Sequence, residues 1–494
     1  MSRRQLLAAG TTGLIATAAV PPAAGAGRRR AAAADGTPEQ IHLTWADNPA
    51  RSVVVSWTSP GRALAPRVRI GQRVITAVER GYADPVGGEV VWTYHALVDG
   101  LRPGATYGYA VTADNDRSAA DPFSATFMTA PEGRAAFRFS SFGDLTPAGA
   151  PWASAASQSG SAVALVETFQ PLFHLLNGDL ADADPSPAAQ PEAWPEAWPE
   201  LAGTLQASAA NRPWLPVPGG HGDGPAERER ALGAYLARYA LPGNGVPGFE
   251  GRWYGFRVGT AAFLCLGDDA GGASSDGAQT RWLETALAAA RADASIDWVV
   301  VQLHPCAWPA AGAGDADAGL PPDWLPLFDR YEVDLVLSGH SRGYERSFPV
   351  RGADCADARR PHPVTTVDSG VFDTSQGTVH LALGGGGAGD DEAGGAGHRD
   401  STDGADAGAA WSARRNTAAG YGVAVFDVNP GSEAGAQTSI TVRYYHAVDG
   451  GPATEPGAAG RADDYALFDT FTLVRPRSDG RRWHPKQPAA SNLA

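Results

Sequence analysis

The sequence predicts an α/β fold preceded by a small all-β sandwich. From about residue 40 to residue 130, short runs of alternating β-branched and aromatic residues indicate antiparallel strands. Beyond Pro131, apolar runs that end in Gly-Asp, Gly-His or His alternate with helical stretches, as in sheets of parallel strands. A chain of 494 residues is too long for one ordinary core, so two or three domains are expected.

The first region has the pattern of a β-sandwich. Residues 41–45 and 53–57 are rich in β-branched and aromatic side chains. Residues 101–109 combine a Pro-Gly turn with two tyrosines. This segment resembles the turn-then-strand part of fibronectin type III domains, in which a tyrosine caps the sandwich. We therefore expect a fibronectin type III-like domain over residues 38–131.

In the second region, five apolar runs each end in an aspartate or a histidine. Open α/β sheets place their ligands at the carboxyl ends of the strands, so these side chains are expected to meet at one edge. Carboxylates and neutral imidazoles hold the metal pairs that orient a phosphate and activate a water. The five residues are Asp144, Asp179, His221, His304 and His340.

The order of these residues resembles the blocks of the metallophosphoesterases, which that family writes GDxG, GDxxY, GNHE, a histidine after a strand, and GHxHxYER. The matching segments here are Gly143-Asp144, Gly178-Asp179, Gly219-Gly220-His221, His304 and residues 339–346. The Tyr344-Glu345-Arg346 ending and the preceding sandwich point to the purple acid phosphatase branch. The resemblance implies a metallophosphoesterase-type αββα sandwich over residues 134–475.

The resemblance also implies a role for each residue. Asp144 would hold a first metal ion, Asp179 would bridge two ions, and His304 and His340 would hold the second. His221 would lie over the substrate phosphate and protonate the departing oxygen. The expected cofactor is iron, zinc or manganese, one or two ions per chain, and the expected substrate is a phosphate ester.

Three of the metal-ligand positions that the resemblance implies depart from the family pattern. Asp182 stands where the family has a metal-binding tyrosine, Gly220 where it has an asparagine, and Arg342 where it has the second histidine of GHxH. Asp182 can serve as an alternative metal ligand. The Arg342 guanidinium can bind neighbouring carboxylates or a substrate phosphate, and it can take the charge position of the first cation.

These departures leave three functions open. The first is an exported metal-dependent phosphoesterase that hydrolyses phosphomonoesters with an altered metal site. The second is a catalytically impaired pseudo-phosphatase that binds a ligand or associates with the cell wall. The third is a structural or adhesive protein whose sandwich is the working part. His42, His95 and His446 lie outside the blocks and receive no role.

The N-terminus predicts export. Arg3 and Arg4 precede a mild apolar run, a combination typical of a twin-arginine signal, expected here over residues 1–34. A retained signal anchor is the alternative. We expect a secreted or cell-envelope protein with no membrane span after signal removal. The formal net charge of −15 argues against a nucleic-acid-binding platform.

Two further segments are expected to lack regular structure. The Gly- and Asp-rich stretch at about 384–418 predicts a surface loop, and the tail at 476–494 is expected to be disordered. The chain has three cysteines, an odd number, none of them in a CxxC pair. The fold is therefore not expected to depend on a disulfide framework.

Overall fold

The structure is a computed structural model. It describes residues 35–83, 90–118, 120–145, 159–180, 194–219, 225–267, 277–307, 320–321, 323–340, 343–351, 361–386, 410–416, 422–447, 465–480 and 483. The expected twin-arginine segment lies outside these residues.

The N-terminal region forms two four-stranded antiparallel sheets, ordered β1-β2-β6-β5 and β4-β3-β7-β8. Trp57 and Tyr94 are fully buried between them. The Tyr107 hydroxyl accepts a hydrogen bond from the Arg102 N–H at 2.8 Å, so the expected tyrosine cap is present. The strands are β1 Glu39–Thr44, β2 Val53–Ser59, β3 Arg67–Ile70, β4 Arg73–Thr76, β5 Val78–Ala83, β6 Val90–Val98, β7 Thr106–Thr112 and β8 Ser124–Met128.

Two seven-stranded mixed sheets follow. The first, ordered β11-β10-β9-β20-β21-β22-β17, contains β9 Phe137–Phe142, β10 Phe173–Leu176, β11 Trp214–Pro216, β17 Val371–Asp373, β20 Gly422–Asn429, β21 Gln437–Ala447 and β22 Tyr465–Pro476. The second, ordered β12-β13-β14-β15-β18-β16-β19, contains β12 Tyr254–Val258, β13 Ala261–Cys265, β14 Trp298–Gln302, β15 Leu335–Ser338, β16 Tyr344–Ser347, β18 Val379–Leu383 and β19 Ser412–Asn416.

The two large sheets pack face to face across an aromatic core. The ring of Phe139 stacks on that of Phe426 with centroids 4.4 Å apart, and it meets the ring of Phe263 edge-on at 5.3 Å. Such stacked and edge-to-face pairs add to the burial of the rings themselves. This core continues into the buried side chains of the N-terminal sandwich, so the four sheets share one apolar interior.

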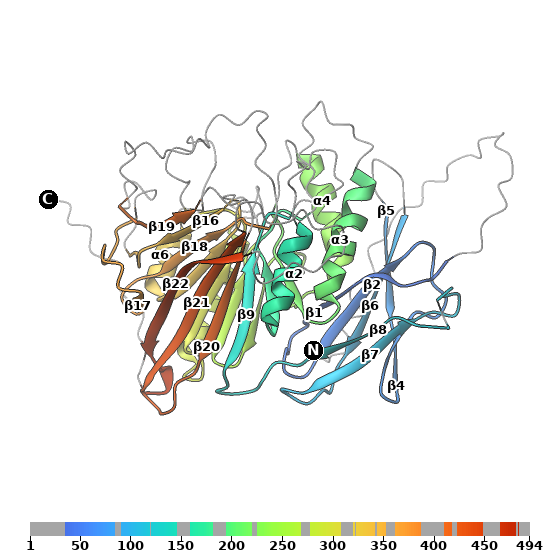
Figure 1. The fold of residues 1–494 in the computed structure, drawn as a ribbon, viewed down its shortest axis with the longest axis horizontal. Helices are drawn as coiled ribbons and strands as arrows, with labels where there is room; N and C mark the ends of the chain where they lie inside the picture. The colour runs from blue at the N-terminus through green and yellow to red at the C-terminus, as the bar shows by residue number, and fades with distance from the viewer. Residues whose placement is uncertain are drawn as a thin grey trace.

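Helices cover the outer faces of the two large sheets (Figure 1). α2 Ser159–Phe169 and α3 Trp194–Ala209 bury apolar side chains against the first sheet. α5 Ala278–Ala292 and α6 Trp324–Arg330 do the same against the second. α4 Pro225–Arg238 stands beside α3, next to the N-terminal sandwich. The predicted fold class, an αββα sandwich behind an all-β sandwich, is confirmed.

The chain is ordered in two places where disorder or loop was expected. β19 lies inside the expected loop at 384–418 and pairs with β16. Beyond Pro476, the Ser478 N–H donates to the Asp297 carboxylate at 2.7 Å. The Trp483 ring also stacks on Tyr331 with centroids 5.7 Å apart. The prediction of a disordered tail was wrong for these residues, because long-range contacts hold them.

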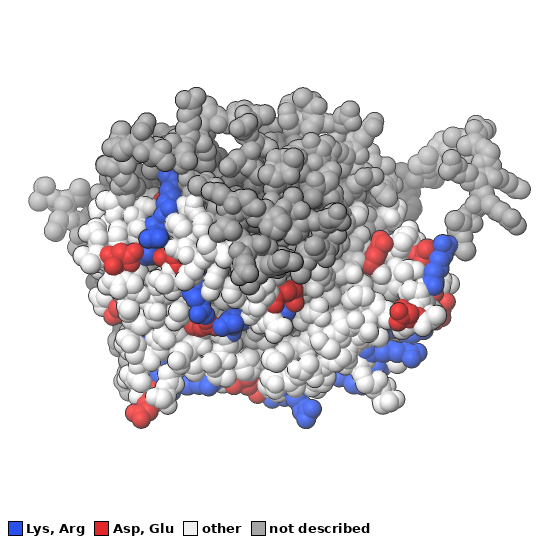
Figure 2. Space-filling view, viewed as in Figure 1, with Lys and Arg blue, Asp and Glu red and all other residues white. Residues whose placement is uncertain are grey.

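The described surface carries mixed charge. On the face drawn in Figure 2, basic and acidic side chains lie interspersed along the sandwich and the large sheets. Among the described residues, no helix has both the length and the apolar character that crossing a bilayer requires. Cys265 and Cys306 are buried free thiols.

Candidate metal centre

Four strand ends converge at one edge of the two large sheets. β9 runs parallel to β10 in the first sheet, and β14 runs parallel to β15 in the second. Because parallel strands finish at the same edge, the residues that follow them meet there. These residues are Asp144 after β9, Asp179 after β10, His304 after β14 and His340 after β15.

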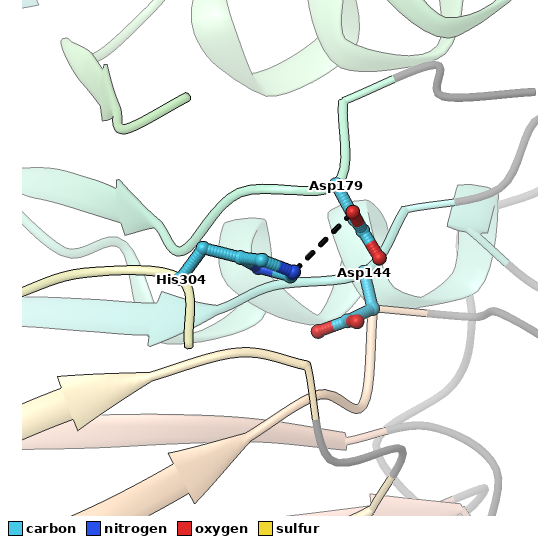
Figure 3. A group of neighbouring side chains, drawn as sticks. All are labelled: Asp144, Asp179 and His304. Atoms are coloured by element: carbon cyan, nitrogen blue, oxygen red, sulfur yellow. Dashed lines mark ion pairs between the residues drawn. The ribbon is translucent and has the colours of Figure 1, made fainter. Parts of the chain in front are cut away.

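Three of these side chains form a compact group. One ligand atom from each of Asp144, Asp179 and His304 lies within 4.8 Å of the others. Figure 3 shows the three side chains pointing toward one another from separate loops. The His304 Nε2 atom lies 3.3 Å from the Asp179 Oδ1 atom. Asp144 is only 3 % exposed and His304 only 2 %. Two carboxylates and an imidazole at this depth are a suitable donor set for a divalent cation.

The hydrogen bonding of His304 fits a metal ligand. Its Nδ1 atom lies 2.8 Å from the Asn177 carbonyl oxygen. A carbonyl oxygen only accepts, so Nδ1 carries the proton and, in the neutral ring, the Nε2 lone pair faces Asp179. Metal-ligating histidines are oriented in this way, with the second ring nitrogen donating to a carbonyl. The residues present therefore fit the metal that the resemblance implies.

His340 joins the group through its backbone and its ring. Its N–H donates to the Asp144 Oδ2 atom at 2.9 Å. Its ring meets the His304 ring edge-on, with centroids 5.3 Å apart. The structure thus places four of the sequence-predicted site residues side by side.

The backbone at the site is strained. Asp144, Asp179 and His340 have φ values of 63°, 50° and 64°. Residues with a Cβ rarely occupy this left-handed region, at a cost of order 1–3 kcal/mol each, and such residues cluster at functional sites. Three strained residues within one group indicate that the fold holds these ligands in place against local preference.

The glycines of the motifs leave room for the ligands. A Cβ on Gly178 would lie 2.6 Å from the His304 Nδ1 atom, and one on Gly219 would lie 2.7 Å from the Asp179 nitrogen. A Cβ on Gly339 would lie 2.8 Å from the Asp144 Oδ2 atom. These distances are too short for any side chain. The glycine in each block is therefore required by the close approach of the strand ends.

Two supporting residues were not predicted from the sequence. Asn177 accepts a hydrogen bond from the Ser141 hydroxyl at 3.1 Å and donates to the Ser338 carbonyl at 3.3 Å, so it links the ends of β9, β10 and β15. The Gln302 amide donates to the carbonyls of Leu176 and Leu215 at 2.9 and 3.1 Å. A polar residue at the end of each buried apolar run is the signal that could have found them.

The remaining predicted residues lie outside the described part of the chain. These are His221, Asp182 and Arg342, together with Gly220. Their proposed roles as proton donor, metal ligand and fixed cation therefore stay predictions. Gly219, which begins the third block, is described and borders both Asp179 and His304.

Comparison with known proteins identifies the family. Residues 38–129 match the family model described as the purple acid phosphatase N-terminal domain. An uncharacterized protein of Mycobacterium tuberculosis is 35 % identical over 88 % of this chain and 87 % of its own length. Acid phosphatase type 7 of Mus musculus is 24 % identical over 70 % of this chain and 77 % of its own.

A solved structure agrees with these matches. The purple acid phosphatase from yellow lupin (Lupinus luteus) seeds aligns with 90 % of this chain and 75 % of its own, with a TM-score of 0.64 and 16 % identity. At that identity the likeness shows a shared fold. Together with the matched N-terminal domain and the acid phosphatase relative, it shows that the chain is a purple acid phosphatase-like protein.

Proposed function

We propose that this protein is a metal-dependent phosphoesterase that hydrolyses phosphomonoesters. The observation that carries the proposal is the group of Asp144, Asp179 and His304 at the converging strand ends, with His340 beside it. His304, His340 and Asp179 form a two-histidine, one-carboxylate set that suits zinc, manganese or iron(II). A metal ion held there supplies Lewis acidity toward the phosphate and lowers the pKa of a water.

The protein's own residues supply orientation and a proton. Asp179 and His304, held by strained backbone and by the Asn177 carbonyl, present fixed ligand atoms at the edge of the sheets. Proton transfer to the leaving alcohol oxygen is assigned to His221, by its place in the third block. Such a proton donor matters most for esters whose leaving group is a strong base.

The departures from the family pattern affect the expected number of metal ions per chain. We propose that the Arg342 guanidinium pairs with Asp144, Asp179 or Asp182 and takes the place of one cation. A fixed positive charge there repels a second ion. The protein then binds about one equivalent of divalent metal rather than two. Arg342→His should open the second place and raise the measured stoichiometry toward two.

The replaced positions Asp182, Gly220 and Arg342 also favour a second function, that of a catalytically impaired protein that binds a phosphorylated ligand or a cell-wall polymer. Metal analysis and hydrolysis of 4-nitrophenyl phosphate separate the two. Turnover that is lost with a chelator, restored by metal and absent in Asp179→Asn supports the phosphoesterase. Stoichiometric metal binding without turnover of any phosphomonoester supports the binding protein.

We also propose that the protein is exported by the twin-arginine route, because Arg3 and Arg4 precede a short apolar run. The Arg3→Lys/Arg4→Lys double variant should stay in the cytoplasm, while the unmodified protein reaches the medium or the envelope. Fractionation followed by immunoblotting measures the difference. Equal export of both would contradict the proposal.

A further inference from the structure

The last turn of α4 ends against the N-terminal sandwich. A helix leaves its final carbonyl oxygens without intrahelical partners, and these oxygens need donors from elsewhere when they are buried. In α4 the Tyr235 oxygen is bonded by the Tyr239 N–H at 3.0 Å. The next two oxygens, those of Leu236 and Ala237, receive donors from the sandwich. The Arg238 oxygen lies 3.0 Å from the Nε2 atom of His42, whose Nδ1 atom lies 2.9 Å from the Gln40 carbonyl oxygen.

These contacts come from three strands of one sheet, in which β5 and β6 are neighbours and β2 separates β6 from β1. On β5, Arg80 donates to the Leu236 oxygen at 2.9 Å. On β6, the Nε2 atom of His95 lies 3.1 Å from the Ala237 oxygen. On β1, His42 makes the contact with the Arg238 oxygen. The sheet β1-β2-β6-β5 therefore caps α4, a function that usually falls to residues of the helix's own chain segment.

The chemistry of His95 suits a buried cap. Its Nδ1 atom lies 2.8 Å from the Ser56 hydroxyl, which can donate to it, so Nε2 carries the proton that the Ala237 carbonyl accepts. Burial lowers the pKa of His95 to about 3, so the ring donates as a neutral group. A neutral donor avoids the desolvation cost of a buried ammonium or guanidinium.

A second contact carries the position of α4 to the metal centre. The Tyr235 hydroxyl, on α4, donates to the Pro216 carbonyl oxygen at 2.9 Å, and Tyr254 on β12 donates to the same oxygen at 2.7 Å. Pro216 ends β11, and Gly219, three residues on, borders Asp179 and His304. A chain of direct contacts thus joins the sandwich, α4, the end of β11 and the ligand group.

α3 is held by the same domain. The Tyr109 hydroxyl donates to the Ala210 oxygen at 2.7 Å, just past the helix end, and the Ile41 N–H donates to the Gln206 side chain at 2.8 Å. Arg238 at the end of α4 lies over the Trp198 ring of α3, 4.7 Å from its centroid. Both helices that flank β11 in the sequence are therefore anchored on the sandwich.

From this arrangement we infer that His95 and Arg80 are positioning residues for the proposed reaction. By capping α4 they fix the end of β11 and Gly219, which begins the third block. The N-terminal sandwich is then part of the catalytic unit rather than a separate binding module. The inference rests on the proposed function, because it assigns the third block the proton transfer to the leaving oxygen.

The experiment compares three variants. His95→Leu removes the donor, whereas the amide of His95→Gln can still donate. Arg80→Gln changes an exposed side chain, so misfolding is a small risk. Arg67→Gln is the control, because Arg67 pairs with Asp114 at 2.6 Å on the other sheet of the same domain. Each metal-loaded protein is assayed with phenyl phosphate and with 2,4-dinitrophenyl phosphate, whose leaving group needs no proton.

If the cap positions a proton donor, kcat for phenyl phosphate should fall at least about tenfold in His95→Leu, part of the roughly 10²–10⁴-fold that acid catalysis contributes. On the same reasoning, kcat for the dinitrophenyl ester should fall less than about threefold. His95→Gln should recover most of the loss, Arg80→Gln should show a smaller loss of the same kind, and Arg67→Gln should show none. Equal losses with both esters, or no loss in any cap variant, would overturn the inference.

Hydrogen exchange tests the positioning role of His95 independently of turnover. Amides in the last turn of α4 and those of Val217 and Gly219 should exchange about tenfold faster in His95→Leu, since a lost buried hydrogen bond makes local opening easier. They should be unchanged in Arg67→Gln. Exchange that stays slow at Val217 and Gly219 would overturn the inference. If the unmodified protein hydrolyses neither ester, the proposed function fails, and this measurement still tests the positioning contact.

Discussion

Buried carboxylates at the two ends of the large sheets have different partners. At the end where β14 and β15 begin, Asp334 is fully buried and accepts hydrogen bonds from Arg291 at 2.6 Å, from the Val299 N–H at 2.8 Å, and from Arg475 and Thr374. Burial alone would raise the pKa of Asp334, but the two guanidinium groups outweigh it and hold that pKa below its usual value.

At the opposite end, where the same strands finish, Asp144 accepts from the His340 N–H and Asp179 faces the His304 imidazole. An arginine is a permanent cation, whereas an imidazole nitrogen with a free lone pair binds a metal ion. The comparison teaches that two arginines neutralise the buried carboxylate at one edge of the fold, whereas at the other edge the proposed metal ion would supply the positive charge.

The largest effect on stability is expected at Asp334, which pairs with two buried arginines. Asp334→Asn would leave Arg291 and Arg475 buried beside a neutral amide, and removing one partner of a buried ion pair typically costs about 3–5 kcal/mol. Urea unfolding followed by circular dichroism measures the loss. Asp427→Asn is the control, because this half-buried carboxylate pairs with two arginines near the surface, Arg138 and Arg443, and its loss should cost less than about 1 kcal/mol per pair. Equal midpoints for the two variants would refute the distinction.

At the metal end, the same kind of change should affect function rather than folding. In the metal-free protein, Asp179→Asn relieves repulsion between neighbouring carboxylates, so the urea midpoint should stay the same or rise. Metal binding should be lost and hydrolysis should fall at least about 100-fold, because the ligand that orients the ion is gone. A metal-free Asp179→Asn protein as unstable as Asp334→Asn would show that Asp179 is structural.

The same comparison explains what the sequence could predict. Asp144, Asp179, His304 and His340 were found because each follows an apolar run and a local pattern marks it. The pair Arg475 and Asp334, 141 positions apart, has no local pattern, since only the packing of β22 against the second sheet brings them together. Pairing across sheets is a property of the tertiary fold.

The supporting residues could not be predicted from the sequence for a related reason. Asn177 reads as one polar residue at the end of an apolar run, yet its side chain joins three strand ends. His42 and His95 received no role from the sequence, because their partners are backbone carbonyls of a helix more than 140 residues away. Every residue type has a backbone oxygen, so the sequence does not show which oxygen a histidine contacts. Such a contact is visible only in the structure.

A smaller effect on metal affinity is expected at Asn177, which supports His304 and the strand ends. Asn177→Leu keeps the branched shape and the number of side-chain heavy atoms but removes both side-chain hydrogen bonds, so His304 and the strand ends are held less firmly. Loss of such a supporting residue typically lowers metal affinity about 10–100-fold. Calorimetric titration with zinc or manganese measures it.

Asn244→Leu is the matched control for this change. Asn244 also makes two side-chain hydrogen bonds, both with Gly255, at 2.7 and 3.0 Å on a surface turn. Its loss should leave metal affinity unchanged. A similar drop in both variants would mean that the effect at Asn177 is a general loss of stability.

The smallest effect concerns imidazoles that are buried without a metal role. Burial lowers the pKa of both His95 and His380 to about 3, whereas an unfolded histidine titrates near 6.5. As the pH falls below about 6.5, the unfolded chain takes up protons that the folded protein does not, so acid favours unfolding. Each histidine should lower the free energy of unfolding by about 1 kcal/mol between pH 6.5 and 5.5. His95→Gln should remove one such contribution, seen as a shallower dependence of the urea midpoint on pH. An unchanged pH dependence would show that His95 is protonated in the folded protein, and the neutral donor assigned to the α4 cap would then be wrong.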